Sequence, residues 1–395
     1  MRLRSHKPRS SSSPSAGHDL VPKALGTSPV SALSAVVIGG SGGAASSAPE
    51  ISAREAAELR EFLAAALAEN TRRAYQRDWT DFCAWCLHEG VRHLPAAPES
   101  LARYLVRLAT TGPALLWSST RHELLPRPSD QPAPCRASTI RRRIASINRA
   151  HQSRGLEAPG NAPLIRNLQQ GIRRKLGTSP RKKAPATTEV VRRLLSSVEV
   201  STTAEKARET GRRATQLQAL RDRALILVGF TGCFRRSELA NLQVADFRFV
   251  EEGLEIRLRR SKTDQEGRGS IKRLPFSSQP GLCPIRAVRA WWKAAGITSG
   301  AAFRSIHRGG RVSAEALTDR AVALIIKKLA LRAGLDPGAF AGHSLRSGFA
   351  TSAAQAGANL PELMEQGGWK SERIALGYVQ ERAAWDHNAA AQLGL

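Results

Sequence analysis

Six residues in the second half of the chain have the side chains needed to break a phosphodiester bond. In chain order they are Arg235, Lys262, His343, Arg346, Trp369 and Tyr378. Guanidinium groups donate paired charged hydrogen bonds to phosphate, an ammonium or imidazole can carry a proton, and an indole N–H donates one further bond. A phenol can act as a nucleophile and stay bonded to the phosphorus. The set therefore indicates a protein that cuts nucleic acid by becoming covalently attached to it.

Each of these residues is a weak signal alone, and their order gives them weight. Arg235 comes directly before RSEL, which predicts a short helix at whose start the arginine can lean over a site. Lys262 stands at the end of an expected strand beside a hairpin turn, and His343 and Arg346 are three residues apart on one helical face. Tyr378 is the last of three tyrosines in the chain. A tyrosine in isolation is more often structural, but five upstream partners favour a nucleophile.

The charge of the chain indicates a polyanionic partner. Its 395 residues contain 60 Lys and Arg against 33 Asp and Glu, a formal net charge of +27. Neutralising phosphates releases counterions, so an excess of this size favours nucleic acid whatever its sequence. An acidic membrane surface is the rival interpretation, but no run of about 18 apolar residues is present to span a bilayer. We therefore expect double-stranded DNA as the partner and no membrane.

A one-sided run of charge extends from Arg136 to Lys183, with thirteen Lys and Arg and a single acid, Glu157. Solvated helix faces usually mix charges of both signs, so we interpret this stretch as a surface that contacts the DNA backbone. The residues expected to make these contacts are Arg141, Arg142, Arg143, Arg149, Arg173, Arg174, Lys175, Arg181, Lys182 and Lys183.

Composition divides the chain into three segments. Residues 1–50 are rich in Ser, Pro, Gly and Ala and lack periodicity, which predicts a disordered basic tail. Residues 51–183 are predicted to form an all-helical DNA-binding domain, which ends in the proline-containing linker GTSPRKKAPATTEV. Residues 184–395 are predicted to form a domain that is mainly α with a small antiparallel β-sheet.

Hydrophobic periodicity locates most of the elements. In the first domain, helices are expected over 51–69, 71–90, 98–110 and 138–155, with a proline-rich loop over 112–137. In the second domain they are expected over 216–230, 236–242, 318–333, 343–356 and 360–366. Leu254, Ile256 and Leu258 alternate with charged residues, which predicts a half-buried strand whose partner is SIKRLPF.

The cysteines give no sign of a metal site. The chain has five, Cys83, Cys86, Cys135, Cys233 and Cys283, an odd and scattered set that indicates a reduced intracellular protein. The first two have CxxC spacing, but no second pair completes a zinc site, so we interpret them as buried core thiols. The chain also lacks the GxxxxGK[ST] motif of ATP-binding loops. No metal and no cofactor are expected.

The order Arg, Lys, His-x-x-Arg, Trp, Tyr resembles the signature of the tyrosine recombinase, or phage integrase, family. The resemblance covers about residues 187–380, and the basic helical block before them resembles the family's core-binding domain. FRRSEL and SKTDQEGRG are its most specific stretches. Arg235 and Arg346 match the family's two phosphate-binding arginines. The resemblance thus implies that they stabilise the charge that grows on the non-bridging oxygens.

The other four positions also match the family pattern. Lys262 matches the hairpin lysine, which implies that it protonates the departing 5′ oxygen, and His343 matches the first histidine, which manages the tyrosine proton. Trp369 stands where many members have histidine and some have tryptophan. Tyr378 matches the nucleophile. No member of the set is missing, so the resemblance implies a complete site.

The resemblance implies site-specific recombination of DNA. A 3′-phosphotyrosyl bond and a free 5′-hydroxyl form, and the 5′-hydroxyl of another duplex then attacks, so neither metal nor ATP is needed. The implied assembly is a C-shaped clamp around DNA and a homo-tetramer on paired sites, which is a monomer or weak oligomer when free. The segment after Tyr378 would be a docking helix for a neighbouring protomer. Accessory proteins are among the implied partners, and a cytoplasmic, nucleoid-associated location follows.

Two other functions fit parts of the same pattern. A type IB topoisomerase uses the same chemistry but reseals the original strand, and the compact basic domain and the tail after Tyr378 favour recombination over it. A catalytically silent DNA-binding protein would need the basic block alone. The intact set of six residues argues against that second alternative.

Overall fold

The computed structural model describes residues 52–113, 115–118, 123–126, 133–179, 182–200, 209–259 and 269–378. The chain divides into two compact units, residues 1–180 and 181–395. The domain boundary predicted at residue 183 lies three residues after this division. The predicted tail over residues 1–50 and the predicted docking helix after Tyr378 lie outside the described residues.

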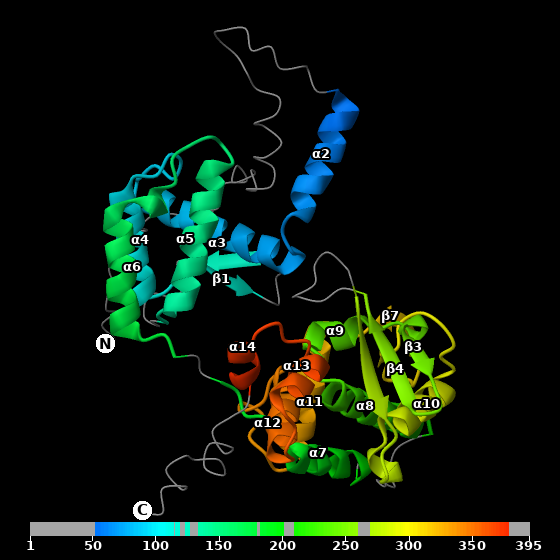
Figure 1. The fold of residues 1–395 in the computed structure, drawn as a ribbon. Helices are drawn as coiled ribbons and strands as arrows, with labels where there is room; N and C mark the ends of the chain where they lie inside the picture. Colours follow the sequence, from blue (N-terminus) through cyan, green and yellow to red (C-terminus); the bar gives the residue numbers. More distant parts are fainter. Residues whose placement is uncertain are drawn as a thin grey trace, which may run out of the picture. The chain divides into compact units, whose positions relative to one another are not determined.

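The first unit consists of helices and one short hairpin (Figure 1). Its elements are α2 (Ala53–Ala65), α3 (Glu69–His88), α4 (Pro98–Thr110), β1 (Leu115–Ser118), β2 (Glu123–Pro126), α5 (Ala137–Gln152), η1 (Pro159–Asn161) and α6 (Pro163–Leu176). The four predicted helices are present, as α2, α3, α4 and α5. The loop expected over residues 112–137, however, contains the antiparallel pair β1–β2, so this unit is not all-helical.

One hydrophobic core joins α3, α4, α5 and α6. Trp79, Phe82 and Cys86 of α3 are buried, as the helical spacing predicted, and they face apolar residues of the other three helices. Burial of each large apolar side chain contributes about 1.5–3 kcal/mol. Burial also raises the pKa of the Cys83 and Cys86 thiols to about 12. The interpretation of this CxxC pair as buried core thiols is confirmed.

The second unit combines helices with two small antiparallel sheets. Its helices are α7 (Thr188–Val200), α8 (Glu209–Thr231), α9 (Arg236–Asn241), η2 (Val244–Asp246), η3 (Pro280–Leu282), α10 (Pro284–Ala295), α11 (Asp319–Arg332), α12 (Ser344–Gln355), α13 (Leu360–Gly367) and α14 (Glu372–Leu376). Its strands are β3 (Phe247–Phe249), β4 (Gly253–Leu258), β5 (Ser270–Pro275), β6 (Arg304–Ile306) and β7 (Val312–Ala316). The sheets have the orders β3–β4–β5 and β6–β7. The sequence predicted a single small sheet in this domain, whereas the described residues form two.

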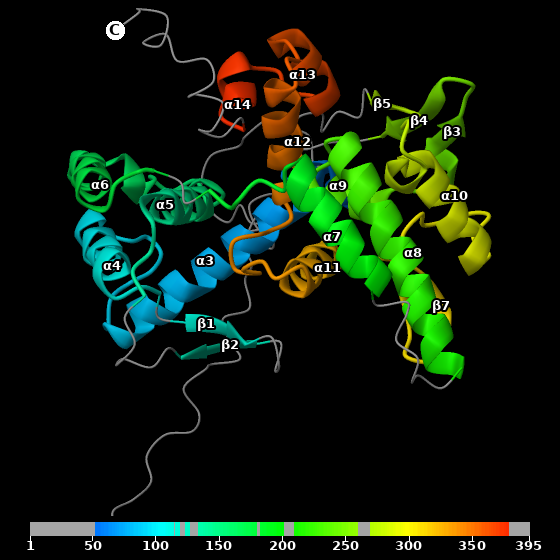
Figure 2. The same ribbon diagram turned by 90° about the horizontal axis from the view of Figure 1, so that it is seen from below.

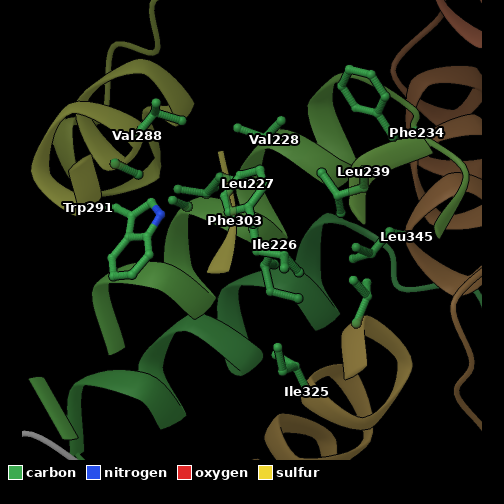
Figure 3. Close-up of a cluster of buried hydrophobic side chains, with 14 of the residues drawn as sticks. Ile226, Leu227, Val228, Phe234, Leu239, Val288, Trp291, Phe303, Ile325 and Leu345 are labelled. Atoms are coloured by element: carbon green, nitrogen blue, oxygen red, sulfur yellow. The ribbon is translucent and has the colours of Figure 1, made fainter. Parts of the chain in front are cut away.

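Helix α8 is the centre of the second unit's core (Figure 3). Its residues 224–228 are all buried, and a helix that is apolar on every side is enclosed by its neighbours. It packs against α7, α10 and α12. Because α8 is held on several sides, the loop that follows it, which carries Cys233 and Arg235, starts from a fixed point.

A smaller apolar cluster lies at the end of the second unit formed by α12, α13 and α14. These three helices lie side by side in both views of the ribbon (Figures 1 and 2). Cys233, Ala350, Leu363, Trp369 and Ala375 make up the cluster, and Tyr378 packs against it. Two of the predicted reactive residues, Trp369 and Tyr378, are therefore held by an apolar cluster.

The linker between the units is fixed to the second unit. The amide of Ala184 donates to the carbonyl of Ala339 at 2.9 Å, and that of Ala186 to the carbonyl of Ser344 at 2.8 Å. Ala186 is buried, and a Cβ on Gly348 would lie 1.9 Å from its carbonyl oxygen. Only glycine allows this close approach of the linker to α12.

Candidate active site

Arg235 is held at the start of α9 by an acid that the sequence analysis did not single out. Its Nη1 donates to Oε1 of Glu238 at 2.5 Å, and its backbone amide donates to Oε2 at 2.8 Å. The next residue, Arg236, points elsewhere and pairs with Asp319 at 2.7 Å. Cys233 has a positive φ of 52°, a sharp turn between α8 and α9. The spacing of three between Arg235 and Glu238 is the signal that could have revealed this pair.

Arg346 is buried in α12, with 1% of its surface exposed. Its Nη1 donates to the carbonyl of Cys233, and its Nη2 donates to the carbonyl of Gly367 at 2.6 Å. Its Nε has no hydrogen-bond partner in the described part of the chain. Among the described residues, no carboxylate forms an ion pair with this guanidinium. The positive charge of Arg346 is therefore held by carbonyl dipoles and is not neutralised.

Trp369 and Tyr378 cover this guanidinium with their rings. The Arg346 Cζ lies 4.4 Å from the ring centroid of Trp369 and 5.4 Å from that of Tyr378. The two rings are 5.1 Å apart and tilted by 39°. The Nε1 of Trp369 is buried and has no hydrogen-bond partner among the described residues. The site thus contains an unused indole donor beside a phenol and an arginine.

The turn that carries Trp369 requires two glycines. Gly368 has a φ of +62°, the left-handed conformation that ends α13. A Cβ on Gly367 would lie 1.9 Å from the Trp369 ring. The amide of Tyr378 donates to the carbonyl of Ala375 at 2.9 Å, directly after α14. Backbone geometry on both sides therefore fixes where the two rings lie.

The other two predicted catalytic residues are placed differently. His343 is the residue before α12, one helical turn before Arg346, and it is exposed. Its carbonyl accepts the amide of Ser347 at 3.0 Å. Lys262 lies outside the described residues. Of the six predicted residues, the structure brings Arg346, Trp369 and Tyr378 into contact.

A second lysine, Lys272 of β5, lies at this site although the sequence analysis did not single it out. It is 3% exposed, and its Nζ donates to the carbonyl of Gln366 and, at 3.4 Å, to that of Glu365. Burial lowers its pKa to about 8, and the positive charges of Arg346 and Arg235 add to this shift. Strand alternation could have found it, because Lys272 lies on the same inward face as Leu274.

The electrostatics of the site favour an anion. Lys272 interacts electrostatically with Arg346 and with Arg235, while Glu238 is the acid that acts on it. Burial raises the pKa of the Cys233 thiol to about 11, so it stays neutral. Three cations and one carboxylate leave net positive charge in this group, and its member Arg346 lies over the Tyr378 ring, which suits a phosphate.

Most of the basic residues predicted to contact DNA lie at the surface. Arg141 and Arg142 of α5, the last-turn residues of α6, and the linker lysines are exposed, and Arg149 is half-buried. The α6 and linker residues are Arg173, Arg174, Lys175, Lys182 and Lys183. The Nζ of Lys183 donates to the carbonyl of Gly338 at 2.5 Å. Arg181 lies outside the described residues.

Arg143 does not fit the surface role predicted for it. It is buried, and its Nη1 donates to Asp81 and to the Tyr104 hydroxyl, while its Nε lies 3.6 Å from Asp78. Arg142 is half-exposed but pairs through two hydrogen bonds of 2.8 and 2.9 Å with the same Asp78. The acids come from α3, more than 60 residues earlier, so the local charge count could not reveal them.

The described ranges contain no candidate for two other kinds of site. No helix there is long and apolar enough to cross a membrane. No group of three or more His, Cys, Asp or Glu residues in that part of the chain could hold a metal ion.

Comparison with known proteins places the chain in a family. Residues 194–384 match the model of the phage integrase family. An integrase/recombinase from Selenomonas ruminantium, a XerD homolog, is 35% identical over 325 residues, which cover 82% of this chain and 84% of that protein. The Cre recombinase of Escherichia phage P1 is 24% identical over 319 residues, 77% of this chain and 81% of that one.

A solved structure has a similar fold. The Tn1549 transposon integrase in complex with transposon right end DNA gives a TM-score of 0.50 at 15% identity, covering 86% of this chain and 98% of that one. With the match to the family model and the 35% identical relative, the assignment rests on most of the length of the chain. The chain belongs to the phage integrase family, the tyrosine-type site-specific recombinases.

Proposed function

We propose that this chain cuts and rejoins DNA at specific sites through a covalent bond to Tyr378. The single observation that carries the proposal is the Tyr378 ring lying over the Arg346 guanidinium, 5.4 Å from its Cζ. A nucleophile and an uncompensated buried cation are thereby held together. An arginine in this position binds the phosphate that the phenol attacks.

Arg346 keeps hydrogen-bond donors for that phosphate. A guanidinium has five N–H donors, and the carbonyls of Cys233 and Gly367 take two of them. The remaining donors, with those of Arg235 and the unused Trp369 indole N–H, stabilise charge on the non-bridging oxygens. Preorganised donors of this kind lower the barrier because they need no reorientation during the reaction.

The reaction exchanges one phosphoester bond for another. The Tyr378 oxygen forms a bond to phosphorus as the bond to the 5′ oxygen breaks, and the departing oxygen takes a proton. His343 receives the phenol proton, and Lys262 supplies the proton to the 5′ oxygen. A 5′-hydroxyl then attacks the 3′-phosphotyrosyl bond and releases Tyr378, so the step needs neither metal nor ATP.

Exposed basic residues of the first unit hold the DNA backbone. Arg141, Arg149, Arg173, Arg174 and Lys175 are the contacts we propose, and Lys182 continues them into the linker. Arg143 is excluded from this surface because Asp81 and Asp78 already bind it. In this proposal both units bind one duplex.

The proposed assembly is a homo-tetramer on paired recombination sites. The free chain would be a monomer or a weak oligomer, and accessory proteins would set the direction of exchange. A DNA-binding protein with a net charge of +27 would work in the cytoplasm, associated with the nucleoid.

A suicide substrate tests the proposal directly. We would screen nicked duplexes from the DNA that flanks the gene for paired inverted repeats and look for adducts that survive denaturing electrophoresis. The wild-type chain should form such an adduct, and Tyr378→Phe should form none while binding the same DNA. Tyr75→Phe, a half-buried tyrosine of α3, is the matched control and should keep the activity. An adduct that persists in Tyr378→Phe would sink the assignment.

Strand exchange separates recombination from strand resealing. A plasmid with two paired sites should give exchanged circles or a deletion product. Relaxation of supercoiled plasmid without any exchanged product would favour the topoisomerase reaction instead.

A further inference from the structure

Three successive carbonyls at the end of α13 bind two cations. The carbonyls of Glu365 and Gln366 accept hydrogen bonds from the Lys272 ammonium, and the carbonyl of Gly367 accepts from Arg346. The last carbonyls of a helix have no partner within the helix and form the negative end of its dipole. The end of α13 therefore binds both Lys272 of β5 and Arg346 of α12, the proposed phosphate-binding arginine.

Other contacts fix the same helix end. The Nε2 of Gln366 donates to the carbonyl of Thr231 at 2.8 Å and to that of Arg273 at 3.3 Å. A Cβ on Gly368 would lie 3.4 Å from the Lys272 Nζ. The ammonium thus lies against the Gly367–Gly368 turn that leads into Trp369. A shift of this turn would move the Trp369 indole and the carbonyl that orients Arg346.

The contact between β5 and α13 is made by a lysine, whose burial is energetically unfavourable. Its ammonium is removed from water close to two other cations, and burial of an ionised group is unfavourable unless it is paired. The neighbouring inward position of β5 is occupied by Leu274, which is 1% exposed. An apolar residue at the position of Lys272 would avoid this desolvation of a charge. The position of the ammonium, bonded to the two carbonyls that precede the Gly367 carbonyl, indicates that its charge or its hydrogen bonds serve the reaction.

We propose that Lys272 is a positioning residue for the cleavage step: it fixes the end of α13, and through it the Gly367 carbonyl that orients Arg346 and the turn that carries Trp369. The ammonium does this from the far side of the turn, without contact with the DNA. This inference rests on the proposed function and adds a residue to it.

The experiment uses the full chain and the suicide substrate on which wild type forms an adduct. Lys272→Met keeps the length of the side chain and removes its donors, whereas Lys272→Gln keeps an NH₂ group that can reach the same carbonyls. Single-turnover cleavage by Lys272→Met should fall about 10- to 100-fold, the range typical of residues that orient a reactive ligand. DNA affinity should change less than about threefold, and Lys272→Gln should retain part of the rate.

Arg273→Gln is the matched control, because the next residue of β5 points outward and its side chain is 66% exposed. It should cleave at the wild-type rate. Urea unfolding of each variant shows whether the chain is folded, and Lys272→Gln carries the comparison if Lys272→Met unfolds.

Two further measurements separate positioning from other roles. With sulfur in place of the bridging 5′ oxygen the leaving group needs no proton, so a positioning defect should persist. Combination of Lys272→Met with Arg346→Gln should slow cleavage by less than the product of the two single losses, because Lys272 acts in part through Arg346. A defect that disappears with the sulfur substrate, additive losses, or a wild-type rate in Lys272→Met would each overturn the inference. If the wild-type chain forms no adduct, the proposed function fails before Lys272 is tested.

Discussion

Arg143 of the first unit and Arg346 of the second are both buried but are held in opposite ways. Arg143 lies against the carboxylates of Asp81 and Asp78 and the hydroxyl of Tyr104. Arg346 lies against two backbone carbonyls and two aromatic faces. Carboxylates neutralise a guanidinium, whereas carbonyl dipoles orient it and leave its charge in place. Burial alone therefore does not identify a functional arginine, but the chemistry of its partners does.

This contrast has a physical cause in the cost of burying charge. A buried charge without a counterion is unfavourable, and such charges cluster at functional sites, where a ligand can supply the missing charge. Arg143 has its counterions within the unit and serves the fold. Arg346 has none among the described residues, and the phosphate of the DNA would supply it.

Arg143→Met should give the largest change in the free energy of unfolding. The substitution leaves Asp81 buried without its main partner, and loss of one member of a buried ion pair typically costs about 3–5 kcal/mol. Urea unfolding of the full chain, followed by tryptophan fluorescence, measures the loss. Addition of Asp81→Asn should restore part of the stability. A loss below about 1 kcal/mol combined with weaker DNA binding would return Arg143 to the DNA contact surface.

Arg346→Gln should change catalysis more than stability. Removal of one preorganised donor to a developing oxyanion usually costs about 10²–10³ in rate, or roughly 3–4 kcal/mol. Single-turnover cleavage of the suicide substrate measures this loss, and DNA affinity should remain within about threefold. Arg236→Gln is the control, since that guanidinium binds Asp319. Cleavage by Arg346→Gln at the wild-type rate would contradict the contrast between a structural Arg143 and a phosphate-binding Arg346.

Because of Lys272, the free energy of unfolding of the second unit should rise with pH in the alkaline range. Burial lowers its pKa from 10.5 to about 8, so between these values the unfolded chain holds a proton that the folded chain lacks. The free energy of unfolding therefore rises as the pH increases from about 8 to 10.5. Below pH 8 the unfavourable burial of the charged ammonium is present in full. The difference in unfolding free energy between wild type and Lys272→Met should shift in favour of wild type by at most about 3 kcal/mol across this window. A constant difference would contradict the shift.

Exposed arginines of the first unit should give the smallest effects. Arg141→Ala or Arg174→Ala each removes about one phosphate contact, which weakens binding to all DNA sequences and lowers the slope of log K against log salt by about 1. Titration at several salt concentrations measures the slope. Arg143→Met, if folded, should leave the slope unchanged although it lies two residues from Arg141. Equal slopes for all variants would show that this surface does not bind DNA.

Local patterns in the sequence predicted much of the fold. The helix expected over 98–110 coincides with α4, and Leu254, Ile256 and Leu258 are buried on β4 as their alternation predicted. Helices α7 and α10 and the β6–β7 pair were not predicted. The β1–β2 hairpin lies in a proline-rich stretch without strand alternation, so only its pairing reveals it.

Contacts between residues far apart in the chain limited the prediction of the site. The order of reactive side chains indicated Arg346, Trp369 and Tyr378, which the structure brings together. The acids beside Arg143 and the α13 carbonyls beside Lys272 lie more than 60 residues away in the chain, and sequence periodicity carries no information about such partners.

The contact between the linker and α12 has a practical consequence for dividing this protein. Ala184 and Ala186 are tied to Ala339 and Ser344, and Ala186 fits against Gly348, two residues from Arg346. A catalytic fragment or a chimera with another DNA-binding domain should therefore keep its junction before residue 182. A junction after Ala186 would remove the backbone hydrogen bonds that connect the linker to the start of α12, the helix that carries Arg346. We expect such a chimera to bind DNA with its new specificity but to lose its cleavage activity.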